Sequence, residues 1–182
     1  MVDFVVKDSR KSEYIMHPAT KLAMGLLERL QARQGGEQGA EPRVLDIGCG
    51  SGILSLMAVE LWPSASIIAS DISKLAVQEA EENMRANGCA KQVQCVQAEG
   101  LEHRVIEEGA PYDIILANIL AKWHLKYLRD MQAALKPDGH LILSGIQAWQ
   151  LQEIEQAVPF AGLGVSGKAE QDGWVGLVLG RH

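Results

Sequence analysis

The feature that most constrains this chain is a glycine-rich turn that directly follows a short apolar run. Residues 44–52 read VLDIGCGSG, so an apolar segment ends in Asp46 and leads into glycines at alternate positions. Glycine allows backbone angles with φ > 0 and lets a ligand approach where a Cβ would collide. The spacing lacks the third glycine of the dinucleotide fingerprint G-x-G-x-x-G, because Ile53 stands in its place. The run therefore predicts a strand, a nucleotide-cofactor loop and a helix.

Two carboxylates indicate which nucleotide cofactor the loop favours. Asp71 ends the next apolar run, residues 66–70, about 20 positions beyond the loop, where a carboxylate accepts hydrogen bonds from both hydroxyls of an adenosine ribose. Asp46 lies directly before the loop, where it would repel the pyrophosphate of NAD. S-adenosylmethionine instead carries an ammonium and a sulfonium, so the two carboxylates favour that cofactor.

Alternating short β-branched runs and helical periods predict the fold class. The pattern from residue 44 to residue 181 is typical of an α/β protein with a doubly wound, mostly parallel, seven-stranded sheet. With 182 residues, the chain is long enough for one domain that buries about 70% of its unfolded surface. Strands are expected near residues 43–47, 66–70, 92–98, 112–117, 139–146, 160–168 and 173–180.

Two helices can be placed from signals at their ends. Ser73 is an N-cap candidate for a helix whose buried face includes Ala80, with Glu79 turned toward solvent. A later helix carries Trp123, which is expected in the core. That helix is expected to stop at residues 136–139, which read KPDG and return the chain to the sheet.

The chain is expected to divide into an N-terminal segment, residues 1–40, and a cofactor-binding catalytic unit, residues 41–182. The first segment contains a predicted helix at about 18–33 and a flexible, glycine-rich break at 34–40. Because this segment is too short to build its own core, we expect it to pack as a flap over the domain within a single folding unit.

Composition argues against several classes of function. The net charge of −6 argues against an electrostatic grip on nucleic acid. No apolar run approaches the ~20 residues of a membrane span, and no signal peptide is recognisable, so a soluble cytoplasmic protein is expected. Three cysteines without a C-x-x-C pair indicate neither disulfides nor a zinc site, and no metal is expected. Cys49 is expected to be a small filler under the cofactor.

Together these motifs resemble class I S-adenosylmethionine-dependent methyltransferases, and most closely the catalytic domain of the PrmA type, which methylates a large-subunit ribosomal protein. The likeness covers roughly residues 14–181 and implies a Rossmann-like methyltransferase fold. It also implies S-adenosylmethionine as cofactor, S-adenosylhomocysteine as product, and direct in-line N-methylation of a protein substrate. Beyond the glycine run, the stretches that carry it are 17–20 (HPAT), 117–120 (ANIL), 141–146 (LILSGI) and 174–179 (WVGLVL).

The resemblance also implies roles for individual residues at the cofactor. In that family the glycine loop holds the methionine end, the acid that ends the second strand binds the ribose, and an acid after the third strand reaches the adenine amino group. By position the two acids are Asp71 and Glu99, although Glu99 also fits a solvated turn residue. The predicted cofactor-binding residues are Asp46, Gly48, Cys49, Gly50, Gly52, Asp71, Ile72, Glu99, Asn118 and Thr20.

Asn118, His17 and Tyr14 are the catalytic candidates on the side of the methyl acceptor. Asn118 follows the apolar run 114–117, at the carboxyl end of a central strand, where its amide can orient an amine or cap the next helix. Histidine is a residue type suited to accepting a proton from an ammonium nucleophile. Tyr14 ends an Arg-x-x-x-Tyr pattern that looks like protein arginine methyltransferases. Those enzymes also use paired glutamates after strand four, which this chain lacks, so arginine is not the expected acceptor.

Two departures from the PrmA type leave the acceptor open. Residues 12–16 read SEYIM where that family has a glycine-rich approach, and we expect no counterpart of its separate N-terminal recognition domain. A protein acceptor is predicted, with RNA or a small molecule as the alternative. An NAD(P)-dependent oxidoreductase and a non-catalytic cofactor-binding partner protein are the alternatives outside the methyltransferases.

Overall fold

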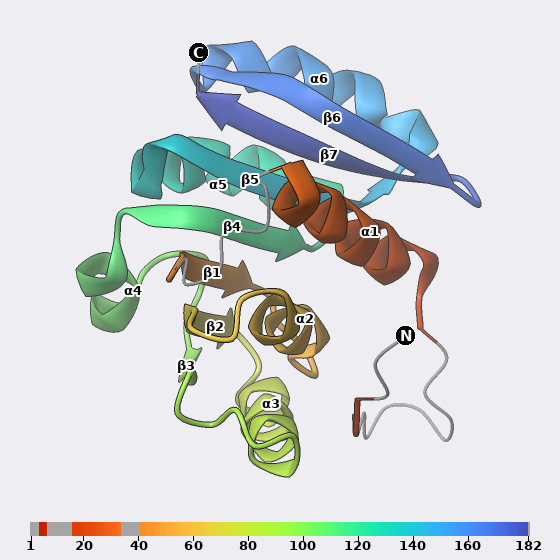
Figure 1. The fold of residues 1–182 in the computed structure, drawn as a ribbon. Coiled ribbons are helices and arrows are strands. Elements are labelled where there is room, and N and C mark those ends of the chain that lie inside the picture. The colour runs from red at the N-terminus through yellow and green to blue at the C-terminus, as the bar shows by residue number, and fades with distance from the viewer. Residues whose placement is uncertain (1–3, 7–15, 34–40, 182) are drawn as a thin grey trace.

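The computed structural model of the protein describes residues 4–6, 16–33 and 41–181. These residues contain one seven-stranded sheet with the strand order β3-β2-β1-β4-β5-β7-β6 (Figure 1). The strands are β1 (Arg43–Ile47), β2 (Ser66–Asp71), β3 (Val93–Gln97), β4 (Tyr112–Asn118), β5 (Leu135–Gln147), β6 (Leu163–Gln171) and β7 (Trp174–Arg181). The helices are α1 (Pro18–Arg33), α2 (Ile53–Leu61), α3 (Lys74–Ala86), α4 (Arg104–Gly109), α5 (Ala121–Ala134), the 3-10 turn η1 (Ala148–Gln150) and α6 (Leu151–Phe160).

Helices cover both faces of this sheet. Strands β1 to β5 pair in parallel, whereas β7 pairs antiparallel with both β5 and β6, so β7 alone runs against the others. Within β4, Ile114 and Leu116 pack with α1, α2 and α3, and the alternate residues Ile115 and Ala117 pack with α4, α5 and α6. A parallel sheet buried on both faces explains the nearly continuous apolar runs of its strands. The predicted doubly wound α/β fold is confirmed.

Helix α1 is a layer of the core, with the bounds that the sequence predicts. It packs against β5, β6, β7 and α2, and lies across the sheet in Figure 1. Its apolar face is closed to solvent, and Leu27 is 0% exposed. The buried residues of the helix are Ala19, Thr20, Leu22, Ala23, Leu26, Leu27 and Leu30.

The predicted end of the helix before residues 136–139 is confirmed, because α5 ends at Ala134, but the following strand begins earlier than expected. Strand β5 begins at Leu135, directly after α5 ends. Tyr112 of β4 pairs with Leu135, but Ile114 already pairs with His140, so the register shifts over this stretch. A bulge of this kind accommodates Pro137, which has no N–H to donate to the ladder. The proline and the glycine therefore lie within the irregular first part of β5.

The expectation for Glu79 is wrong, whereas the predicted start of its helix is confirmed. The Ser73 hydroxyl accepts a hydrogen bond from the backbone N–H of Ala76 at 3.4 Å, as an N-cap does. Glu79 is only 8% exposed. Glu79 lies three residues after Ala76 and Ala80 lies four after it, so both share the buried face of the helix with Ala76.

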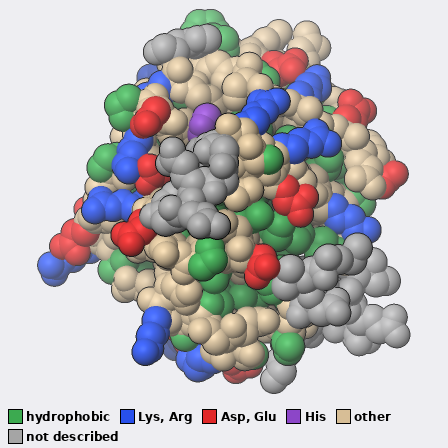
Figure 2. Space-filling view, viewed as in Figure 1, with side chains coloured by type: hydrophobic (Ala, Val, Ile, Leu, Met, Phe, Trp, Pro, Cys, Tyr) green, Lys and Arg blue, Asp and Glu red, His purple; other side chains and the backbone are tan. Residues whose placement is uncertain are grey.

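Charged side chains of both signs are interspersed over the face shown in Figure 2, and no patch of one sign dominates it. Within residues 4–6, 16–33 and 41–181, no helix is both long and apolar enough to cross a membrane. All three cysteines carry free thiols.

Replacing Leu27 by alanine is expected to lower the free energy of unfolding by about 2–5 kcal/mol, because the change leaves a cavity between α1 and the sheet. Urea unfolding followed by circular dichroism measures the effect. Glu28→Ala alters the next residue, on the exposed face, and should change the same quantity by less than about 0.5 kcal/mol. Equal transitions for the two variants would contradict the placement of α1 in the core.

Candidate active site

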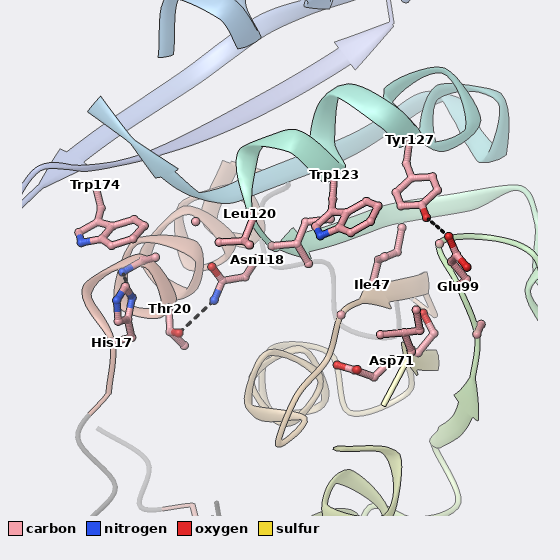
Figure 3. Close-up of a pocket in the computed structure, with 18 residues that line it drawn as sticks. His17, Thr20, Ile47, Asp71, Glu99, Asn118, Leu120, Trp123, Tyr127 and Trp174 are labelled. Carbon is pink, nitrogen blue, oxygen red and sulfur yellow. Dashed lines mark hydrogen bonds between the residues drawn. The ribbon is translucent and has the colours of Figure 1, made fainter. Parts of the chain in front are cut away.

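A cavity of about 510 Å³ opens at the carboxyl ends of the parallel strands (Figure 3). Its volume lies within the range of small-molecule and cofactor sites, on the order of 300–1,000 Å³. The cavity lies where the strand order reverses between β1 and β4, the place where open α/β sheets bind ligands. Of the predicted site residues, the cavity walls include His17, Thr20, Gly48, Asp71, Ile72, Glu99 and Asn118.

The glycine loop joins β1 to α2 at the floor of the cavity. Gly48, Gly50 and Gly52 all have positive φ angles, between 55° and 78°, as their pattern predicts. Gly48 lines the cavity, whereas Gly52 caps α2 and Cys49 packs in the core. Burial raises the pKa of the Cys49 thiol well above its usual range, which suits a filler and not a nucleophile.

Asp46 lies beneath the glycine loop and not on the cavity wall. Its side chain is 1% exposed, and one carboxylate oxygen accepts a hydrogen bond from the Ser55 hydroxyl at 2.7 Å. Burial raises the pKa of the Asp46 carboxyl to about 6, although hydrogen bonds from Ser55 oppose the rise. The positive charge of a cationic ligand above the loop would attract this carboxylate and so favour its ionised form.

Asp71 is oriented by two backbone segments before any ligand arrives. Its Oδ2 accepts the N–H of Gly50 at 3.0 Å, and its Oδ1 accepts the N–H of Ser73 at 2.9 Å. Each carboxylate oxygen has a second lone pair, so the carboxylate can still accept hydrogen bonds from a ligand. Ile72 beside it is 63% exposed and gives the cavity an apolar wall.

Asn118 links the end of β4 to the first turn of α1. Its Nδ2 donates to the Thr20 hydroxyl at 3.0 Å, which leaves Oδ1 to accept a hydrogen bond from a ligand. The N-cap residue of α5 is Leu120, and no side chain caps this helix with a hydrogen bond. The alternative that Asn118 caps α5 is therefore wrong.

Strand β5 holds the same turn of α1 from below. The Ser144 hydroxyl donates to the carbonyl of Ala19 at 2.6 Å, and the Ser144 carbonyl lies 2.7 Å from Nε2 of His124. Burial lowers the pKa of His124 to about 4, so the ring is neutral at physiological pH and donates from Nε2. Gly145, with φ 78°, then brings the β5 backbone close to Asn118 and Ile119.

His17 and Trp174 form the wall at the end of the cavity nearest α1 (Figure 3). Their rings meet edge to face with centroids 4.6 Å apart. His17 Nδ1 accepts the N–H of Ala19 at 3.2 Å, so the neutral ring carries its proton on Nε2. Tyr14, the third catalytic candidate, lies outside the described residues.

Glu99 is an ordered carboxylate at the opposite end of the cavity. Its Oε1 accepts hydrogen bonds from Lys126 Nζ at 2.8 Å and from the Tyr127 hydroxyl at 3.2 Å (Figure 3 shows the second). The bond from Lys126, with the charge it carries, holds the pKa of the Glu99 carboxyl below its usual range. The Glu99 side chain is also 51% exposed, so it fits both the solvated turn residue and the ligand contact that the sequence allows.

Sequence reasoning missed most of the apolar and aromatic cavity wall, including Trp123, Tyr127, Gly145 and Trp174. Trp123, expected in the core, is half-buried and faces the cavity from the first turn of α5. Trp123 and Tyr127 lie one helical turn apart just after Asn118, and this spacing could have indicated that both rings share the face of α5 toward the cavity. The stretch 174–179 carried the family resemblance, but it did not place Trp174 at the cavity, because that position depends on the reversed direction of β7.

The part of the chain that the structure describes contains no group of three or more His, Cys, Asp or Glu placed to hold a metal ion. The parallel sheet with one reversed strand, and the cavity above its switch point, define the Rossmann-like class I methyltransferase fold. The family model described as "Ribosomal protein L11 methyltransferase (PrmA)" matches residues 16–182. The chain belongs to this family.

Relatives and solved structures agree with that membership. A ribosomal protein L11 methyltransferase of Caulobacter sp. (strain K31) is 35% identical over 139 residues, which are 76% of this chain and 47% of the relative. One from Halalkalibacterium halodurans is 33% identical over 162 residues, 89% of this chain and 48% of the relative. The chain thus spans about half the length of the curated relatives it matches.

Among solved structures, a ribosomal protein L11 methylase from Lactobacillus delbrueckii subsp. bulgaricus superposes with a TM-score of 0.79 at 33% identity. The superposition covers 92% of this chain and 80% of that one. TrmN from Thermus thermophilus, at 24% identity and a TM-score of 0.68 over 86% of this chain and 48% of its own, shares the fold.

Asp46→Asn is expected to change how stability depends on pH. The folded-state pKa of about 6 lies above the ordinary 3.8, so the stability of the wild type relative to the variant is greatest below pH 4. This relative stability should fall by about 3 kcal/mol as the pH rises through 6. Urea unfolding at pH 4, 5, 6 and 7 measures it. A constant difference across this range would show that the Asp46 pKa is not raised.

Gly145→Ala is expected to lower the free energy of unfolding by about 1–3 kcal/mol more than Gly173→Ala does. Both glycines have φ near 77°, so alanine meets a similar backbone cost at each. A Cβ on Gly145 would collide with the Ile119 carbonyl oxygen, whereas one on Gly173 would meet nothing within 4 Å. Comparing the thermal unfolding of the two variants isolates the cost of this collision. Equal losses of stability in the two variants would show that the collision does not occur.

Proposed function

We propose that this chain is the cofactor-binding and catalytic part of an S-adenosylmethionine-dependent methyltransferase that N-methylates a protein. The observation that carries the proposal is that Gly48, Asp71 and Asn118 line one cavity at the switch point of the sheet. Membership of the family, whose relatives are named for methylation of ribosomal protein L11, supports it. A ribosomal protein of that kind, met in the cytoplasm, is the acceptor that we propose.

The residues present fit the proposed cofactor. The Asp71 carboxylate, already oriented by Gly50 and Ser73, accepts hydrogen bonds from the ribose hydroxyls, and Ile72 packs on the nucleoside. The backbone of Gly48 lies under the methionine end, with the Asp46 carboxyl beneath the loop as a source of negative potential for its cations. Thr20 assists through its hydrogen bond with Asn118. Cys49 and Gly52 shape the loop from behind.

The sulfonium of S-adenosylmethionine supplies an already activated methyl group, so the chain's own task is mostly positioning. Asn118 Oδ1 accepts a hydrogen bond from an N–H of the acceptor amine, which orients the lone pair of the amine nitrogen into the cavity. His17 offers Nε2–H as a donor and not as the proton acceptor that the sequence suggests, because its Nδ1 already accepts the Ala19 N–H. Trp174 closes the wall beside it, which helps to exclude water. Tyr14 is proposed as a third residue at this end. No metal takes part in the proposed reaction.

Calorimetric titration with S-adenosylhomocysteine tests the cofactor assignment. The wild type is expected to bind in the micromolar range, and Asp71→Asn should weaken binding by about 10- to 150-fold, because one charge-assisted partner of the ribose is lost. Asp130→Asn makes the same change on the exposed surface of α5 and should leave the affinity unaltered. Binding of NADH in place of S-adenosylhomocysteine would overturn the proposal.

Radiolabelled methyl transfer to purified ribosomal protein, RNA and small-molecule fractions then tests the acceptor. Label in the ribosomal protein, dependent on Asn118, supports the proposal. Label confined to RNA or to small molecules would overturn the protein acceptor, and cofactor binding without transfer to any fraction would overturn catalysis by this chain.

A further inference from the structure

The cavity extends from the end of β1 past the ends of β2 and β3, and this direction locates the base of a bound nucleoside. The glycine loop follows β1, Asp71 ends β2, and Glu99 comes two residues after β3. Neighbouring strands lie about 4.8 Å apart. With the methionine end over the loop and the ribose on Asp71, as in the proposed function on which this inference rests, the base lies at Glu99.

The Glu99 carboxylate does not rotate freely at this position. Both of its hydrogen bonds, from Lys126 and from the Tyr127 hydroxyl, end on Oε1. Among residues 4–6, 16–33 and 41–181, no donor reaches Oε2. One oxygen is thus held by α5, and the other is left to accept a hydrogen bond from a ligand.

Of the two donors, Tyr127 is buried and fixed by packing, whereas Lys126 is half-exposed. The Tyr127 ring packs against the backbone at Gly100, where an added Cβ would stand only 2.5–2.9 Å from three ring atoms. Tyr127 also stacks on Trp123, with centroids 6.0 Å apart and an interplanar angle of 13°. Lys126 Nζ lies over both rings, 4.7 Å from the Tyr127 centroid and 5.2 Å from that of Trp123. The ammonium therefore has a preferred place beside Glu99.

We propose that Tyr127 and Lys126 are positioning residues that aim Glu99 Oε2 at the exocyclic amino group of the base, and that they thereby select an adenine over a 6-oxopurine. An amino group donates to a carboxylate oxygen, whereas a 6-oxo group presents a second acceptor and repels it. A site built around a hydrogen bond rejects the analogue that cannot form it. Selection weakens when the carboxylate is free to turn away.

The experiment compares S-adenosylhomocysteine with S-inosylhomocysteine, its 6-oxopurine analogue, by calorimetry. The wild type is expected to prefer the adenine compound by about tenfold or more. Tyr127→Phe, which removes only the hydroxyl, and Lys126→Met should each reduce this preference by about two- to fivefold. The ratio of the two affinities is the readout, because general damage to the cavity would weaken both ligands together.

Two matched controls separate positioning from a structural effect. Tyr112→Phe removes a tyrosine hydroxyl that bonds the Ile106 carbonyl away from Glu99, and Lys122→Met removes the other ammonium that lies over Trp123. Both variants should keep the wild-type preference. A preference in Tyr127→Phe and Lys126→Met equal to that of the wild type would overturn the positioning proposal and leave the proposed function standing. A wild type that binds both compounds equally would overturn base recognition by Glu99, and one that binds neither would overturn both proposals.

Discussion

The reversal of strand order between β1 and β4 is the constraint on which the site depends. From β1 the chain builds outward through β2 and β3, then returns to place β4 against the other side of β1. The connection after β1 crosses to the face of α1, α2 and α3, and the one after β4 crosses to the face of α4, α5 and α6. Because these two connections leave toward opposite faces of the sheet, a crevice forms between them, and the cavity occupies this crevice.

Short polar contacts turn this crevice into a shaped site. Ser144 and Asn118 hydrogen-bond to the first turn of α1 from two adjacent strands, and Asp71 bonds to the glycine loop and to the start of α3. The Ser144 bond is buried and therefore costly to break, and the part-buried bonds of Asn118 and Asp71 add to it, so together they tie the walls to one another. The site is therefore largely formed before any ligand binds.

The sequence predicted features that depend on local physics and missed those that depend on tertiary placement. The strands, the Ser73 cap and the glycine loop follow from patterns that span only a few residues. Asp46 reads as a cofactor contact in the sequence, but the loop above it separates it from the cavity. The KPDG stretch indicates the end of a helix, and α5 does end before it, but a register shift places its proline within β5. Trp174 joins the site only because β7 is antiparallel, which no local pattern encodes.

That reversed strand has a further consequence for how such proteins can diversify. Because β7 runs against its neighbours, its first residue, Trp174, lies at the carboxyl ends of the other strands, paired with Gln147 of β5. The cofactor floor is built by β1, β2 and the segment after β3, whereas this aromatic wall is carried by the terminal hairpin of β6 and β7. A change in the length or shape of the hairpin would therefore alter the wall at Trp174 while the residues of β1, β2 and the segment after β3 stay in place.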